Sequence, residues 1–142
     1  MQHIMATQAF SSAESVREIA LQVMRMSEAI HQALRKYTSA SPVDPSITSA
    51  YALLTEEYAL RARASMLLIE AKRLARPDFP VRQEDVLATL TQVETRLSQS
   101  SSLDELSELI TGLLLFTSSI ISRNNQVILM LLQNLEQGLA MA

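Results

Sequence analysis

The sequence predicts an all-α protein, an antiparallel helical bundle of four helices with a long central C-terminal helix. Three observations favour this fold class. Among 142 residues only 2 are Gly and 4 are Pro, too few for the regular turns of a β-sandwich or barrel. Hydrophobic residues make up 48% of the chain, and they recur three and four residues apart, as on one face of a helix. The breaks in this pattern are short, so we expect one helical domain over residues 1–142.

The first helix is expected over about residues 12–37, after a flexible segment of residues 1–11. Ser11 and Glu14 have the spacing of a capping box, which satisfies backbone N–H groups where a helix begins. The small polar residues and the proline at 38–42 cannot sustain a helical ladder and end the helix. Its core-facing residues are expected to be Val16, Ile19, Ala20, Val23, Met24, Ile30, Ala33, Leu34 and Tyr37.

The second helix is expected over about residues 45–76. Asp44 is a good N-cap, Pro45 suits the first helical position, and Pro77 ends the helix. Two apolar rows run along it and together predict a wide buried face. The first row is Leu53, Leu60, Ala64, Leu67, Ala71 and Leu74, and the second is Ile47, Tyr51, Leu54, Tyr58 and Leu68.

A short third helix is expected over about residues 82–99. The stretch before it, 77–80, reads Pro-Asp-Phe-Pro, and its two prolines predict an extended linker. Glu84 and Asp85 fall in the first helical turn, where the helix dipole favours acidic side chains. The inner face is expected to consist of Val86, Leu90, Val93 and Leu97.

The fourth helix is expected over about residues 103–139, with Ser102 and Glu105 as its capping box. Apolar residues three and four apart form a heptad seam along it, and other faces are apolar too, so we expect it at the centre of the assembly. Since the third helix covers only about half of it, a second copy or a partner helix is expected to cover the rest. The predicted interface residues are Leu106, Ile110, Leu113, Ile120, Asn124, Val127 and Leu131.

Asn124 is the polar residue on this seam, and two interpretations of it are equally open. A buried Asn in a heptad seam lowers stability but can set the register and the number of partners. In that case, replacing it with Leu should raise thermal stability. Alternatively, Asn124 and its neighbours Arg123 and Asn125 mark a solvated kink or a short break in the helix.

Residues that carry most enzyme chemistry are scarce. The chain has no Cys, which excludes disulfides, iron–sulfur clusters and thiol nucleophiles. Glu28 and His31 form one Glu-x-x-His pair, but a metal site in a bundle needs a second such pair. We therefore expect a simple contact between these two side chains on the helix surface. Gly112 and Gly138 cannot build a phosphate-binding loop. We expect no enzyme, no catalytic or metal-binding residue and no cofactor.

The charges indicate no particular ligand. A net charge of −3 gives no electrostatic case for nucleic acid. The longest uncharged run, 109–122, is shorter than the roughly 20 residues that cross a membrane. With no signal peptide in the first residues, we expect a cytoplasmic protein. Glu57 and Arg61 are expected to form an ordinary surface pair. A solvated helix surface, rather than a docking face for an acidic partner or lipid, is favoured for Arg61, Arg63, Lys72, Arg73, Arg76 and Arg82.

These observations favour a non-enzymatic interaction or scaffolding protein that self-associates, as a dimer, through its apolar C-terminal helix. An alternative comes from residues 122–126, Ser-Arg-Asn-Asn-Gln, before the apolar run 127–132. This segment loosely resembles the C-terminal helix of flagellar hook-associated-protein chaperones, which are small, acidic and helical. The resemblance covers one helix and implies an export-type chaperone or adaptor that binds a partner's helix. A further alternative is a small-molecule sensor bundle with an apolar cavity between its helices.

Overall fold

The computed structural model describes residues 7–38, 46–100 and 102–140, with only the backbone for 46, 47 and 140. The fold class is confirmed as all-α. The only β-type pairing in the described part of the chain is an isolated bridge between Gln8 and Arg82. No helix there is long and apolar enough to cross a membrane. The six helices are α1 (Ala13–Thr38), α2 (Ser46–Ile69), α3 (Ala71–Leu74), α4 (Gln83–Gln99), α5 (Leu103–Ile121) and α6 (Asn125–Ala140).

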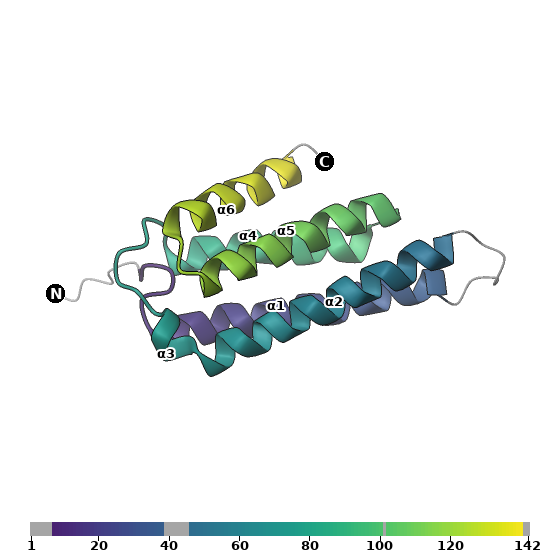
Figure 1. Ribbon diagram of the computed structural model, residues 1–142. Helices are drawn as coiled ribbons and strands as arrows, with labels where there is room; N and C mark the ends of the chain where they lie inside the picture. Colours follow the sequence, from purple (N-terminus) through teal and green to yellow (C-terminus); the bar gives the residue numbers. More distant parts are fainter. Residues whose placement is uncertain (1–6, 39–45, 101, 141–142) are drawn as a thin grey trace.

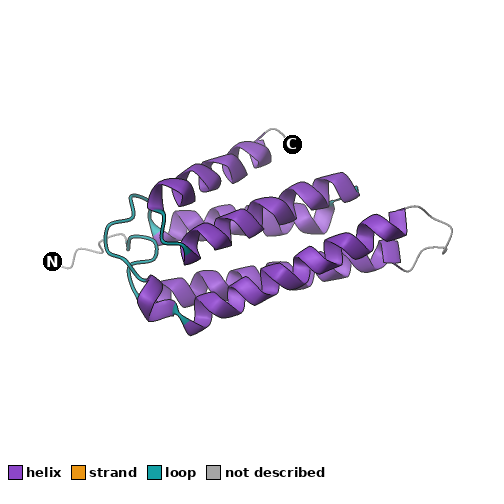
Figure 2. Cartoon of the chain, in the orientation of Figure 1, coloured by secondary structure: helices purple, strands orange, loops and turns teal. Residues whose placement is uncertain are grey.

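The long helices run roughly along one axis, and neighbours in sequence are antiparallel (Figure 1). α1 and α2 form one pair, α4 and α5 pack against that pair, and α6 lies across α4 and α5 on the opposite side. The connections that the structure describes gather mostly at the end where the N-terminal segment lies (Figure 2). One continuous core runs through all of these helices.

The N-terminal segment is where the first difference from expectation appears. Residues 1–6 lie outside the described part, but residues 7–11 are docked rather than flexible. Ala9 and Phe10 are fully buried, and the Phe10 ring meets the Phe79 ring edge-on at 5.0 Å. The backbone N–H of Ala9 donates to the Val81 carbonyl at 2.8 Å. The segment is fixed because it covers the linker before α4.

The start of α1 is also shifted by one residue. Ser12, not Ser11, is the cap, since its Oγ accepts from the Ser15 backbone N–H at 3.1 Å. The capping box predicted at the start of α5 is half correct. Ser102 Oγ accepts from the Glu105 N–H at 3.1 Å, whereas the Glu105 carboxylate pairs with Arg96 of α4 at 2.7 Å.

The second helix ends earlier than predicted. α2 stops at Ile69, the chain turns at Glu70, and the four-residue α3 follows, so Pro77 lies beyond the helical part. The expected start at Asp44 and Pro45 lies outside the described residues. The first apolar row is buried as predicted. In the second row Leu54 and Leu68 are half-buried and pack against the core, and the side chain of Ile47 lies outside the described residues. Tyr51 and Tyr58 of that row are 56% and 59% exposed.

The predicted fourth helix is broken, so a single long C-terminal helix is wrong. Arg123 has φ 61°, in the left-handed region, and ends α5 in a Schellman-type turn. Its N–H donates to the Ile120 carbonyl at 3.0 Å, and the Asn124 N–H donates to the Ser119 carbonyl at 3.3 Å. Asn124 then caps α6, because its Oδ1 accepts from the Val127 N–H at 3.1 Å. Of the two interpretations of Asn124, the break is confirmed and the buried seam is wrong.

The break explains how the apolar excess of this segment is covered. α6 turns back antiparallel to α5, and its buried residues Ile128, Leu132 and Leu135 join the common core. α5 packs against α2 on one side and α6 on another. Much of the surface that was expected to need a second chain is therefore covered by the second half of the same segment.

Candidate interaction site

A hollow lies between α5 and α6, toward the end of α6 where the two helices diverge (Figure 1). It has a volume of about 450 Å³ and is open to solvent. Gly112 lets the helices approach closely at its base, since a Cβ there would lie 2.9 Å from Leu135 Cδ2. At Gly138 a Cβ would meet nothing within 4 Å, so the wall is open. The leucines that line this α5–α6 groove are Leu109, Leu115, Leu131, Leu135 and Leu139.

The surroundings of the α5–α6 groove are poor in charge. From residue 109 to residue 140 the only charged residues are Arg123 and Glu136. Glu136 accepts a hydrogen bond from Thr89 of α4 at 3.2 Å. At one end of the groove Arg96 pairs with Glu105, and Glu108 is exposed beside them. The groove thus combines an apolar, uncharged wall with a slightly acidic end.

The seven predicted interface residues are not brought together by the fold. Leu106, Ile110, Leu113 and Ile120 have no exposed surface, because they lie in the chain's own core. Asn124 is exposed and caps α6. Val127 and Leu131 are partly buried, and Leu131 alone lines the groove. Their role in contacts between chains stays a prediction.

The other four leucines of the groove are not among the interface residues that the sequence predicts. Leu109 lies on α5 outside the predicted heptad seam, and Leu115 is 51% exposed. The usable signal was Gly112 within an otherwise apolar helix, since a conspicuous helical glycine often marks a close approach of another helix. The helix that approaches Gly112 is α6 of the same chain. The sequence does not predict this contact, because the break at 122–124 is only one of two open interpretations of Asn124.

A second distinctive group is a polar cluster between α1 and α2. His31 Nδ1 lies 2.9 Å from Glu57 Oε1, and Arg61 Nε donates to Glu57 Oε2 at 3.1 Å. Arg61 also reaches Glu28 at 3.4 Å. The predicted surface pair of Glu57 and Arg61 therefore exists, but Glu57 is fully buried. The predicted contact of His31 is corrected, since its partner is Glu57 on the other helix rather than Glu28.

The pKa values of Arg61 and Glu28 shift in the directions that their hydrogen bonds favour. The hydrogen bond to Glu57 raises the pKa of Arg61, and Glu28 adds to that effect. Hydrogen bonds from Gln32 and then Arg61 lower the pKa of the Glu28 carboxyl. Both shifts favour the charged forms, as expected for ion pairs that fasten two helices.

Chemically, the cluster resembles a histidine oriented by a carboxylate, but the His31 ring lies beside Tyr58, with ring centroids 6.4 Å apart. In the described residues, no group of three His, Asp or Glu side chains could hold a metal ion. We therefore assign the cluster to the packing of α1 against α2.

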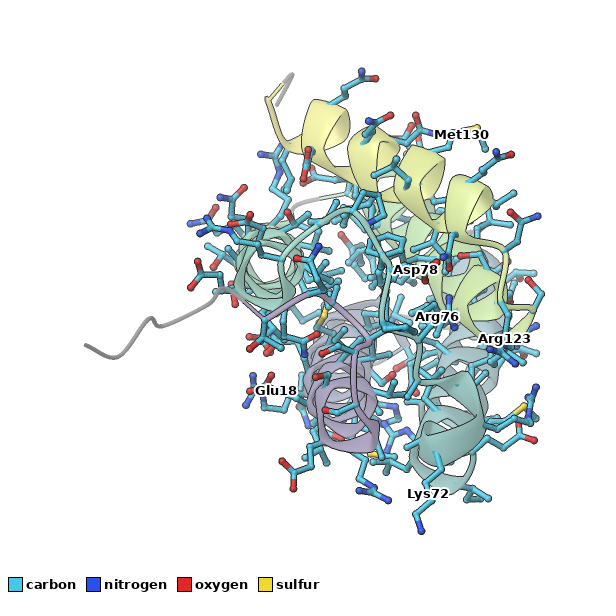
Figure 3. The ribbon with its side chains drawn as sticks, turned by 90° about the vertical axis from the view of Figure 1, so that its left-hand side faces the viewer. Glu18, Lys72, Arg76, Asp78, Arg123 and Met130 are labelled. Atoms are coloured by element: carbon cyan, nitrogen blue, oxygen red, sulfur yellow. The ribbon has the colours of Figure 1, made fainter. Side chains whose placement is uncertain are left out.

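Arg76 is the third distinctive group, and its burial corrects the expected surface position. It is only 5% exposed, and Figure 3 shows it among the helix ends at the end of the molecule where the N-terminus lies. Its guanidinium donates to the carbonyls of Leu74 and Ile120 and, at 2.7 Å, to Asn125 Oδ1. Burial lowers the pKa of Arg76, and the nearby charge of Arg123 lowers it further. Arg76 thus ties α3 to the break between α5 and α6.

Comparison of the chain with protein-family models, with curated proteins and with solved structures finds no match.

Proposed function

We propose that the protein is a non-enzymatic helical interaction protein, and that its α5–α6 groove binds an amphipathic helix of another protein. What supports this is an open groove lined by five leucines, whose charged lining residues, Arg96, Glu105 and Glu108, lie at one end. An accessible apolar centre with polar and charged residues at its rim is a feature of protein interfaces. Groove-binding helices insert apolar side chains three, four and seven residues apart, which suits a hollow of about 450 Å³.

The charges at the end of the groove specify the partner further. Glu105 and Glu108 outnumber Arg96 there. The partner helix is therefore expected to carry two or three large aliphatic side chains on one face and a Lys or Arg beside them, so that the basic residue meets the acidic end. An export-type chaperone or adaptor, the alternative drawn from residues 122–132, would work in this way.

This proposal takes the place of self-association through the whole C-terminal segment. That mode would use Leu106, Ile110 and Leu113, which lie in the core of the same chain. Exposing them to a partner would require opening the core, whereas the α5–α6 groove is accessible as it stands.

The test is the binding of a fluorescent synthetic 18-residue amphipathic helix with Leu on one face and flanking Lys, followed by anisotropy. Leu115→Glu places a charge in the groove and is expected to weaken binding at least about tenfold, or 1.4 kcal/mol. Leu21→Glu on α1 is the matched control, because Leu21 and Leu115 are 53% and 51% exposed. A peptide with flanking Glu should bind more weakly than the Lys peptide.

Equal binding to both variants, or none to the unmodified protein, would show that the groove does not take such a helix. If a small apolar molecule bound in the groove and the peptide did not, the small-molecule sensor would replace the helix receptor as the function.

A further inference from the structure

An uncharged, largely apolar stripe runs along the outer face of α2. Its residues follow one another at intervals of three and four, and they lie opposite the buried row of the same helix. The first and last residues of the stripe are 18 positions apart, or roughly 27 Å at 1.5 Å per residue. Four of its side chains are large and exposed: Tyr51 at 56%, Tyr58 at 59%, Met66 at 44% and Ile69 at 83%. The complete α2 stripe is Tyr51, Thr55, Tyr58, Ala62, Met66 and Ile69.

The outer face of α1 shows that the fold does not require such a stripe. α1 packs against α2 and α4, just as α2 packs against α1 and α5. Yet the outer face of α1 carries Arg17, Arg25, Glu28 and Arg35, with Leu21 as its one large exposed hydrophobic residue. One buried face is enough to hold a helix in the bundle. The apolar character of the α2 stripe therefore needs a cause outside the single chain.

The arginines beside the stripe are turned away from it. Arg61 binds Glu57 and Glu28, and Arg63 Nε donates to Ser118 Oγ on α5 at 2.6 Å. No charged residue belongs to the stripe itself. Two copies of this surface can therefore face each other without bringing like charges together, which an acidic or basic surface could not do.

A hollow beside the stripe supplies a matching shape. It has a volume of about 330 Å³ and lies between α2 and α5, lined by Ala62, Arg63, Met66, Ser118 and Ile121. Tyr58 projects from the same stripe one helical turn before Ala62, and its ring is held beside His31. The surface thus carries both a large aromatic side chain and a hollow next to a small residue.

We infer that the protein forms a twofold symmetric dimer in which the α2 stripes of two copies pack antiparallel. With the twofold axis near residue 60, Tyr58 faces the partner's Ala62 and enters the hollow beside it, and the contact occurs twice. Tyr51 then faces the partner's Ile69. At the centre the large Tyr58 meets the small Ala62, which lets the two helices approach closely, and at each end Tyr51 and Ile69 form an apolar contact.

A membrane surface fits the same stripe less well. Arg61 and Arg63 beside the stripe are bound to Glu57 and Ser118. The other basic residues near it lie at one end, in α3, where Arg73 is paired with Glu70 at 2.8 Å. Attraction to anionic lipid needs several free basic residues along the apolar face. This dimer is also independent of the α5–α6 groove, so either proposal can fail alone.

Sedimentation of the full chain over a range of concentrations tests the dimer. A single-helix contact is smaller than a standard interface, so a dissociation constant on the order of 10 μM is expected. Tyr58→Glu and, separately, Ile69→Glu should each raise it at least about tenfold. Leu21→Glu, an exposed leucine on α1, should leave it unchanged, and circular dichroism checks that each variant is folded. A monomer at about 200 μM, or variants that still dimerise, would overturn the dimer.

The register is tested with engineered cysteines, which is simple because the chain has no Cys. A mixture of the Tyr51→Cys and Ile69→Cys variants should form a disulfide, because the two positions face each other. Either variant alone should not, since its two copies would lie roughly 27 Å apart along the helices, far beyond the ~7 Å limit between Cα atoms. Cross-linking of each variant with itself, but not of the mixture, would overturn the antiparallel arrangement.

Discussion

The helix pair α1–α2 and the helix pair α5–α6 are both antiparallel, but they are fastened in different ways. α1 and α2 share a buried carboxylate, Glu57, which joins His31 on one helix to Arg61 on the other. In the described part of the chain no ion pair joins α5 to α6. They meet through leucines and the close approach at Gly112.

The difference determines where each helix pair offers an apolar surface for binding another molecule. A buried charge cluster demands a fixed geometry, because its members lose their hydrogen bonds when the helices move apart. A seam of leucines tolerates a gap, and the gap at the end of α5–α6 is the groove that we propose as a binding site. In α1–α2, by contrast, the accessible apolar surface lies on the outside, along the α2 stripe.

The largest effect is expected at Glu57. Glu57→Ala removes the hydrogen bonds to His31 and Arg61 and leaves a small cavity, so the free energy of unfolding should fall by about 3 kcal/mol. Urea unfolding measures it. Glu108→Ala, which removes an exposed carboxylate at the groove, should cost less than about 0.5 kcal/mol. A similar loss for both variants would mean that Glu57 does not fasten the two helices.

Arg76→Ala comes next and concerns the break that makes the α5–α6 pair. The Leu74 and Ile120 carbonyls would lose a donor, but the cost of burying a charge would disappear as well, so a net loss of about 2 kcal/mol is expected. Hydrogen exchange should show greater opening at residues 118–128 than at α1. Uniform destabilisation, with no preference for the break, would contradict the role given to Arg76.

The break itself is tested by two variants of opposite sign. Asn124→Leu should lower the free energy of unfolding by about 1 kcal/mol, because it removes the N-cap of α6. The seam interpretation requires the reverse, a higher melting temperature. Arg123→Gly should raise the free energy of unfolding by about 0.5–1 kcal/mol, because glycine adopts the left-handed conformation without strain. Thermal melts show whether each variant is more or less stable than the unmodified protein. A higher melting temperature for Asn124→Leu would contradict the break and favour the continuous helix.

The smallest effect is a pH dependence at the edge of the α1–α2 cluster. The pKa of Glu28 is lowered in the folded chain, so the unfolded chain binds more protons as the pH falls through roughly 4.5. The stability that Glu28 contributes is thus present above that pH and lost below it. Glu28→Gln should make the melting temperature fall slightly less between about pH 6 and pH 3.5. Glu14→Gln, on the same helix but outside the cluster, is the control. An equal change in the pH dependence of its melting temperature would show that the effect does not come from the contacts of Glu28.

The sequence by itself determined the fold class, the helical segments and most of the inner faces. The row Leu53, Leu60, Ala64 and Leu67 is buried as its spacing predicts, and Ser102 caps α5 as its position predicts. These features are local, since a helical period and a cap depend on residues a few positions apart. The proline-rich linker at 77–80 was equally visible, because proline restricts its own backbone and that of the residue before it.

Only the tertiary structure decided which apolar faces are covered. Tyr51 and Tyr58 were expected to be buried beside that row and are exposed, whereas Ile128 and Leu132 are buried because α6 turns back over α5. The turn depends on a left-handed Arg123, the Asn124 cap and the guanidinium of Arg76 from a distant segment. Periodicity shows that a face is apolar, but what covers it depends on where the neighbouring helices lie. The same limit hid the α5–α6 groove and the α2 stripe, since both are surfaces that no helix of the chain covers.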